Sequence, residues 1–252
     1  MEAKSVAERA IQIAGREVHV WSVRTDSRDA AARLEWVLSP EERTHAARFR
    51  FDHLRGSFIV ARATLRALLG AYLRVPPAAI RFRSGPRGKL ALDPQCGLQF
   101  NLSHSHGLAS YAFTLGCEIG IDVERIRPLA DCESVARRFF HAGEVADLLS
   151  LPDAERLRAF FLCWTRKEAY IKAIGTGLAT SLDRCRVTFL PSQPPAIAHM
   201  TGDPEAKQPW SLHDLALSPD YAGAIAYRDA PRPITVFPEF HAAAPLSELM
   251  SR

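Results

Sequence analysis

Two short stretches of the chain decide how it is expected to fold: 119-IGIDVE-124 and 164-WTRKEAYIK-172. The first stretch is typical of a short apolar strand. Asp122 and Glu124 are two residues apart, so their side chains leave the same face of that strand, roughly 6–7 Å apart along the backbone. The second has helical periodicity and places Glu168 and Lys172 one turn apart on one face. Carboxylates rarely enter an apolar strand unpaired, so we expect a positive group between the two segments.

Three carboxylates from a strand and a helix would form an oxygen-only ligand set, which suits Mg²⁺. We therefore predict that Asp122, Glu124 and Glu168 bind a magnesium ion, with Lys172 facing the phosphates of a substrate. Two simpler interpretations stay open. Glu168 and Lys172 could form a surface ion pair worth under about 0.5 kcal/mol. Asp122 and Glu124 could lie on a strand edge exposed to water.

The composition is that of an ordinary globular protein, with 252 residues, 47% hydrophobic and 24% charged. The net charge is +4, and only five of the 32 basic residues are lysine. Arginine suits phosphate recognition, although a high arginine content can also reflect genome composition. The five cysteines form no CxxC pair, which argues against a disulfide framework or a zinc site.

Targeting and membrane signals are not visible in the sequence. The first ten residues carry charges throughout and contain no apolar h-region, and no apolar run approaches the roughly 18–20 residues needed to span a bilayer. We expect a cytoplasmic protein with no membrane partner. A nucleic-acid-binding module would show aromatic residues interleaved with basic ones, plus a known fold pattern. Neither is visible, so no nucleic-acid partner is expected.

The predicted elements follow the order helices, strands, helices, strands, which is typical of an α+β fold. Ser39 and Glu42 form a capping-box pattern at the start of one helix. We predict helices near 54–73, 131–140, 142–151 and 153–174, and strands near 80–83, 89–92, 98–103, 108–115, 119–124, 185–190, 210–217 and 221–227. This gives two halves of similar size, 1–117 and 118–228, the second carrying the metal site. Residues 229–252, rich in proline and alanine, are expected to form a tail that lies over the surface or is partly mobile.

The two opening stretches, extended to IGIDVER and WTRKEAYIKAIGTGL, resemble the motif pair of the Sfp-type 4′-phosphopantetheinyl transferases. The 44-residue spacing from Glu124 to Glu168, the tryptophan and the final lysine all fit. Further matching stretches follow in the family's order: LSPEER (38–43), ARATLR (61–66), GKL (88–90), FNLSHS (100–105) and RFFHAGE (138–144). The resemblance implies a monomer of two pseudo-symmetric α+β halves, with the cofactor in the cleft between them.

The resemblance also implies the reaction. The phosphopantetheine arm of coenzyme A would pass to a serine of an apo acyl, peptidyl or aryl carrier protein, releasing adenosine 3′,5′-bisphosphate. Magnesium on the three carboxylates would bridge the pyrophosphate of coenzyme A, and Lys172 would stabilise the departing charge. Such chemistry needs alignment and charge neutralisation more than covalent catalysis.

Other site residues are carried over from the matched motifs. Glu168, acting through a water, or Glu144 would take the serine proton; alternatively, Glu144 is a first-turn helix carboxylate favoured by the helix dipole. His104, beside Ser103, would contact the pyrophosphate. A Ser103–His104 hydrolase pair is disfavoured because no GxSxG stretch surrounds it. Gly88 and Lys89 match the turn beside the adenine, although they could also form an ordinary hairpin turn.

The residues that hold the 3′-phosphate are less well defined. Arg50 and Arg55 are the candidates, with His45, Arg62 and Arg87 as further options. An arginine cluster after the metal strand could steer an acidic carrier protein toward the site, or could be an ordinary solvated face: Arg125, Arg127, Arg137 and Arg138. Two rival activities remain, a hydrolase that cleaves the same pyrophosphate with water and a non-catalytic coenzyme A binder.

Overall fold

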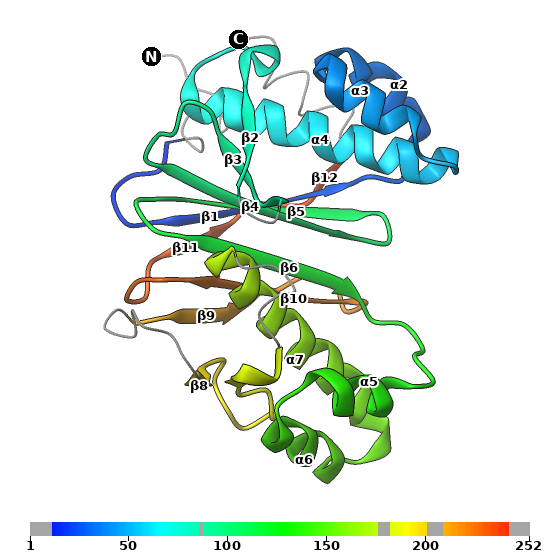
Figure 1. The fold of residues 1–252 in the computed structure, drawn as a ribbon, viewed down its shortest axis with the longest axis vertical. Helices are drawn as coiled ribbons and strands as arrows, with labels where there is room; N and C mark the ends of the chain where they lie inside the picture. The colour runs from blue at the N-terminus through cyan, green and yellow to red at the C-terminus, as the bar shows by residue number, and fades with distance from the viewer. Residues whose placement is uncertain (1–11, 86–87, 176–181, 201–208, 242–252) are drawn as a thin grey trace, which may run out of the picture.

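The computed structural model describes residues 12–85, 88–175, 182–200 and 209–241. Two layers of strands lie at the centre of the molecule, with one group of helices above them and another below (Figure 1). The predicted α+β class is therefore confirmed. Within the described residues, the helices that are present are too short or too polar to cross a membrane.

The first half packs helices over one sheet. β5 (Leu108–Leu115) lies between β1 (Val18–Arg24) and β4 (Leu98–Ser105), and both neighbours are antiparallel to it. The other elements of this half are α2 (Arg28–Leu34), η1 (Glu35–Val37), α3 (Pro40–Ala47), α4 (Asp52–Leu73), η2 (Pro77–Ala79), β2 (Phe82–Ser84) and β3 (Leu90–Leu92). β2 and β3 form a separate hairpin.

The helices of this half begin and end as their residues predict. The Ser39 hydroxyl accepts from Glu42 N at 3.2 Å, and the Glu42 carboxylate accepts from Ser39 N at 2.9 Å, which confirms the capping box at the start of α3. Helix α4 ends at Leu73, and its C-cap residue Arg74 lies in the left-handed region at φ 57°, two residues before the first of the prolines that stop the helix. Its apolar face joins the strands in one core.

The second half is built around α7 (Asp153–Ile174), which lies along a small sheet (Figure 1). That sheet has the order β6 (Ile119–Arg125), β10 (Tyr221–Tyr227), β9 (Ser211–Asp214), with all pairs antiparallel. The remaining elements are α5 (Cys132–Phe139), α6 (Ala142–Ser150), η5 (Leu182–Arg184), β7 (Cys185–Val187) and β8 (Ile197–Met200). Residues 116–118 connect β5 to β6, and we propose the boundary between the halves there.

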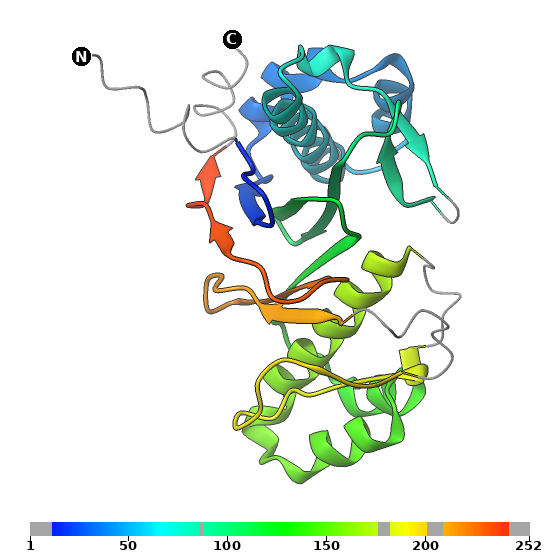
Figure 2. The ribbon, with the colours of Figure 1, turned by 90° about the vertical axis from the view of Figure 1, so that its left-hand side faces the viewer.

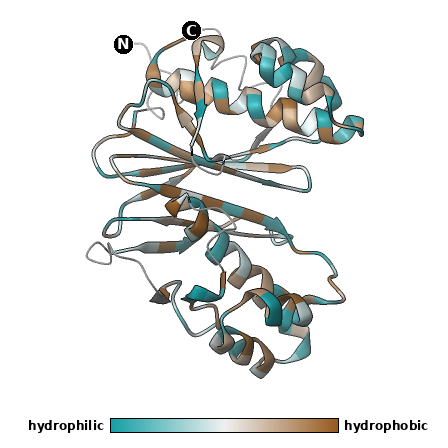
Figure 3. Cartoon of the chain, in the orientation of Figure 1, coloured by the Kyte–Doolittle hydropathy of each residue, from teal (hydrophilic) through white to brown (hydrophobic). Residues whose placement is uncertain are grey.

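The two sheets share an apolar core, so the halves are packed against each other. Val18, Val20 and Ala112 of the first sheet cluster with Ile119, Ile121, Val123, Ile225 and Tyr227 of the second. The central strands accordingly carry many hydrophobic residues in Figure 3. Burial of apolar surface stabilises a protein by roughly 25 cal/mol per Å². Separating the halves would expose this shared core to water, so the core favours a fixed arrangement of the halves.

Part of the segment after β10, which the sequence predicted to be a tail, adds to the edge of the first sheet. Two short strands, β11 (Ile234–Val236) and β12 (Phe240–His241), pair in parallel with β1. The Phe237 ring between them stacks on Trp21, with ring centroids 3.8 Å apart. The physical reason is the open edge of β1, whose backbone groups need partners on the side away from β5. Residues 242–252 lie outside the described part of the chain.

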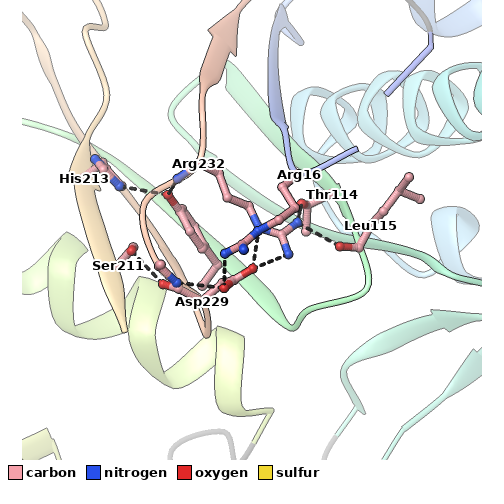
Figure 4. A network of polar contacts seen from close by, with 9 residues as sticks. Arg16, Thr114, Leu115, Ser211, His213, Asp229 and Arg232 are labelled. Atoms are coloured by element: carbon pink, nitrogen blue, oxygen red, sulfur yellow. Dashed lines mark hydrogen bonds and ion pairs between the residues drawn. The ribbon is translucent and has the colours of Figure 1, made fainter. Parts of the chain in front are cut away.

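Arg232 ties this segment to the first half (Figure 4). Its Nη1 donates to Thr114 Oγ1 at 2.7 Å and to the Leu115 carbonyl at 2.8 Å, both on β5. Its Nη2 and Nε donate to the Asp229 carboxylate at 2.5 and 2.9 Å, and Asp229 also pairs with Arg16. Because Arg232 is buried, each of these bonds replaces one to water, and the network fixes where the chain returns to the first sheet.

Candidate active site

A glycine sets the distance between the strand and the helix that carry the predicted site. A Cβ atom at Gly120 would lie 2.1 Å from the Ala169 carbonyl oxygen and 2.4 Å from Ala173 N. Only glycine therefore lets the backbone of α7 rest directly on β6. The close approach brings Glu168 and Lys172 over the carboxylates of the strand.

The positive group expected beside Asp122 is Lys172. Its ammonium lies 2.6 Å from Asp122 Oδ1 and donates to Ser103 Oγ at 2.9 Å. The Ser103 hydroxyl in turn donates to Asp122 Oδ1 at 2.9 Å. Asp122 is only 3% exposed, so the interpretation of a strand carboxylate open to water is wrong for this residue, whereas Glu124 is half-buried.

The other two predicted carboxylates lie close enough to Asp122 for its charge to shift their pKa values. Glu124 accepts a hydrogen bond from Ser105 Oγ at 2.7 Å. Burial raises the pKa of Asp122, Glu124 and Glu168. The negative charge of Asp122 raises the pKa of Glu124 and Glu168 further, while Lys172 lowers all three values. The three acids therefore form one electrostatically coupled group.

Alternate residues of β4 hold β6 in place, a role that the sequence reasoning missed. Asn101 Oδ1 accepts from Ile121 N at 3.0 Å, and Ser105 Oγ accepts from Arg125 N at 3.2 Å. Because β6 is an edge strand, its outward amides need such partners. Polar residues at every second position of NLSHS were the available signal. Ser103, expected to bind the cofactor, belongs to this row.

The carboxylates have the chemistry of a divalent-cation site. In the described residues, no three His, Cys, Asp or Glu side chains lie close enough to form a ready metal cluster, and the Lys172 ammonium is the cation beside Asp122 Oδ1. However, Asp122 Oδ2 is buried and has no hydrogen-bond partner in the described part of the chain. A buried, unbonded carboxylate oxygen beside two further acids with raised pKa values is a donor set that Mg²⁺ fits.

His104, Gly88 and Lys89, three of the predicted cofactor residues, lie near the junction of the halves. The His104 ring is exposed, yet the surrounding protein and the charge of Lys172 lower its pKa. Lys89 Nζ donates to the Ala173 carbonyl at 2.8 Å and to the Ile119 carbonyl at 3.3 Å. Gly88 lies in the hairpin turn at φ +85°, a conformation that favours glycine.

A pocket of about 300 Å³ lies between the halves beside this hairpin. Arg83, Lys89 and Phe100 line it from the first half, and Glu118, Ile174 and Gly175 line it from the second. Its position at the end of α7, near Lys172, makes it a candidate binding site for part of a cofactor.

Comparison with known proteins identifies the family. The family model described as the 4′-phosphopantetheinyl transferase superfamily matches residues 118–226, which contain β6 and α7. The chain is 38% identical over 214 residues to the 4′-phosphopantetheinyl transferase HetI of Nostoc sp., covering 83% of this chain and 87% of that relative. The chain belongs to the 4′-phosphopantetheinyl transferase superfamily. Its activity is therefore transfer of phosphopantetheine to carrier proteins.

Two further similarities extend this result. The transferase is 27% identical over 224 residues to the 4′-phosphopantetheinyl transferase Sfp of Bacillus subtilis, covering 86% of this chain and 95% of the relative. The solved structure of holo-[acyl-carrier-protein] synthase from Thermotoga maritima is 19% identical and covers 45% of this chain and 64% of its own. Its TM-score of 0.35 is too low to bear on the fold.

Glu144 was expected as a possible base, but in this transferase its side chain is enclosed within the fold. It is 0% exposed, and its oxygens lie 2.6 and 2.9 Å from Lys167 Nζ. They also accept from His141 N at 2.8 Å and from Val187 N at 2.7 Å. With both oxygens bonded inside the fold, Glu144 joins α6, α7 and β7 and cannot meet an incoming serine in this arrangement.

The 3′-phosphate candidates lie on and before α4 and do not line the pocket beside the hairpin. Arg55 pairs with Glu35 at 2.8 Å, and Arg50 lies over the Phe51 ring. The further options are also engaged: His45 packs against Phe49 and Phe58, and Arg62 lies 3.7 Å from Glu42. Arg87 lies outside the described residues.

Proposed function

We propose that this transferase moves the 4′-phosphopantetheine arm of coenzyme A to a serine of an apo acyl, peptidyl or aryl carrier protein, with Mg²⁺, releasing adenosine 3′,5′-bisphosphate. The observation that carries the proposal is the coupled acidic group on β6 and α7, with Lys172 beside it. The carboxylates can hold a divalent cation, and that cation together with Lys172 would neutralise the negative charge of a pyrophosphate.

Asp122, Glu124 and Glu168 would hold the magnesium ion. When bound, Mg²⁺ supplies positive charge that neutralises and orients the pyrophosphate. Lys172 adds a second cation that can stabilise the negative charge on the leaving bisphosphate. The hydroxyl of Ser103 holds both Asp122 and Lys172 in position.

Glu168 is our candidate for the base that takes the serine proton, acting through a water. It is half-buried on α7, and its pKa is raised chiefly by burial and then by the charge of Asp122. A raised pKa brings a carboxylate nearer to the operating pH and strengthens it as a base. Because Glu144 is enclosed within the fold, Glu168 is the remaining candidate base among the two acids that the sequence analysis proposed for this role.

The cofactor is proposed to bind at the junction of the halves. The hairpin of Gly88 and Lys89, together with the pocket beside it, would take the adenine end. The exposed His104 ring, close to Lys172, would contact the pyrophosphate. Arg50, which precedes α4, or Arg55, on α4, would have to reach the 3′-phosphate from outside the pocket lining.

A basic surface adjoins the acidic group and is proposed to dock the carrier. Its members are exposed residues at the end of β6 and on α5: Arg125, Arg127, Arg137 and Arg138. Such a patch steers an acidic partner and makes its binding sensitive to salt. We expect Arg125→Glu to raise KM for the carrier and to leave coenzyme A binding unchanged. An unchanged KM would refute docking there.

The experiment that tests the function is incubation of the protein with coenzyme A, Mg²⁺ and several apo carriers, followed by mass spectrometry of each carrier. A gain of one phosphopantetheine on a carrier supports the proposal. Release of free phosphopantetheine without carrier labelling would instead indicate a hydrolase, and binding without either product would indicate a non-catalytic binder. Light scattering of the same sample tests the proposed monomer.

A further inference from the structure

The Lys89 side chain crosses from the first half of the molecule to the second. It leaves the β2–β3 hairpin, which reaches toward the end of α7 in Figure 2. Its ammonium donates to the Ala173 carbonyl of α7 at 2.8 Å and to the Ile119 carbonyl of β6 at 3.3 Å. One cation of the first half therefore joins the two elements of the second half that carry the acidic group.

The end of α7 is a favourable place for such a cation. The last four carbonyls of a helix have no partner within the helix, and the helix dipole makes this end negative. Ala173 lies in that last turn, and the helix ends at Gly175, whose amide bonds to the Ile171 carbonyl at 3.0 Å. The Lys89 stem passes across this end, because a Cβ at Gly175 would lie 3.3 Å from Lys89 Cδ.

Lys89 is half-buried, and two backbone carbonyls accept hydrogen bonds from its ammonium. Burial lowers the pKa of the Lys89 ammonium, and the nearby Glu118 carboxylate offsets part of this effect. A desolvated ammonium needs acceptors for its three N–H groups, and the two carbonyls take two of them. The hydrogen bonds from Lys89 to the two carbonyls therefore contribute to the packing at the junction between the halves.

We propose that Lys89 is a positioning residue, whose ammonium sets the placement of the last turn of α7 on β6 and thereby the placement of Lys172 and Glu168 relative to Asp122. Ala173 directly follows Lys172, and Ile119 directly precedes the glycine on which α7 rests. This inference rests on the proposed function and assigns the Lys89 ammonium a role different from contact with the nucleotide.

The test compares Lys89→Met, which keeps the length of the stem and removes the charge, with Lys89→Arg and with Arg81→Met. Arg81 is an exposed cation just before the same hairpin, so its variant controls for the loss of one positive charge. Four quantities are measured for each: kcat, the Kd of coenzyme A, the melting temperature, and amide hydrogen exchange over residues 170–175.

For Lys89→Met we expect kcat to fall by about tenfold to a hundredfold, the size of effect that a small misplacement of a catalytic group produces. Amide exchange in the last turn of α7 should rise, and the Kd of coenzyme A should stay within about twofold. Lys89→Arg should recover part of kcat, since its guanidinium can donate to both carbonyls. Arg81→Met should match the wild type in all four measurements.

Two results would overturn the inference. A rise of about tenfold or more in the Kd of coenzyme A with unchanged kcat and exchange would make Lys89 a ligand contact. A lower melting temperature with kcat and Kd preserved would make it merely structural. If the wild type labels no carrier at all, the proposed function fails, whereas the exchange measurement still reports whether Lys89 holds the end of α7.

Discussion

Gly120 and Ala169 are in backbone contact: a Cβ on Gly120 would lie 2.1 Å from the Ala169 carbonyl oxygen. This contact joins the strand of Asp122 to the helix of Glu168 and Lys172. It gives a physical reason for a glycine two residues before the first acid, because any side chain there would push the helix away from the strand.

Gly120→Ala is therefore expected to destabilise the protein by about 1–3 kcal/mol or more and to lower turnover by at least about a hundredfold. Denaturant unfolding and kcat measured on the folded variant check this. Gly97→Ala is the control, because a Cβ at Gly97 meets no atom within 4 Å. Near-normal turnover of Gly120→Ala would show that the close approach does not position the site.

Mg²⁺ should stabilise the wild type, because an ion that binds the folded state alone raises its melting temperature. Glu168→Gln should lose most of this gain. Without Mg²⁺, the variant should melt no lower than the wild type, since a half-buried acid repelled by Asp122 and Glu124 has been neutralised. Thermal melts with and without about 10 mM Mg²⁺ test this. Glu155→Gln, an exposed position on α7, is the control, and an equal Mg²⁺ gain in both variants would contradict the ligand assignment.

The buried pair of Lys167 and Glu144 is expected to support the fold and not the chemistry. Lys167→Met should cost about 3–5 kcal/mol, because it leaves a fully buried carboxylate without its cation. The double variant Lys167→Met, Glu144→Gln should cost less than the sum of the two single changes. Asp153→Asn provides the comparison, since its pair with Arg156 is exposed and should be worth under about 1 kcal/mol.

Additive costs in that cycle would mean that the two charges do not interact. A Glu144→Gln variant with normal stability but no turnover would restore Glu144 as a catalytic candidate.

His19 should make the protein sensitive to mild acid. It is buried against the Tyr72 hydroxyl at 2.9 Å and the Phe237 ring, and burial lowers its pKa, with Glu17 opposing the shift. In the unfolded state His19 binds a proton as the pH falls through about 6.5, whereas in the folded state it stays neutral to lower pH. The free energy of unfolding therefore decreases until the pH reaches the pKa of His19 in the folded state.

We expect the stability advantage of the wild type over His19→Gln to be larger at about pH 7.5 than at about pH 5.5. Denaturant unfolding at both values checks this. An advantage that is the same at both pH values, or larger in acid, would show that His19 is not held neutral by its surroundings.

The sequence by itself determined many of the local elements and the chemistry of the acidic group, but it did not predict β1, α2, β8, β11 or β12. The bounds of α7, β5 and β10 match the predicted 153–174, 108–115 and 221–227, because periodicity and end residues are local signals. The motif pair also indicated Asp122, Glu124, Glu168 and Lys172. The structure pairs Asp122 with Lys172, and the charge of Asp122 raises the pKa of Glu124 and Glu168.

Only the tertiary structure decided what several polar groups bond to. Lys89 reaches a carbonyl 84 residues away, Ser105 reaches an acid 19 residues away, and Glu144 is enclosed by Lys167 and Val187. The pairing of β1 with β11 and β12 likewise joins the two ends of the described chain. Each of these contacts depends on two segments that are far apart in the sequence. The free energy of their association comes from burial and from the geometry of the hydrogen-bond partners, and no local pattern of residues contains that information.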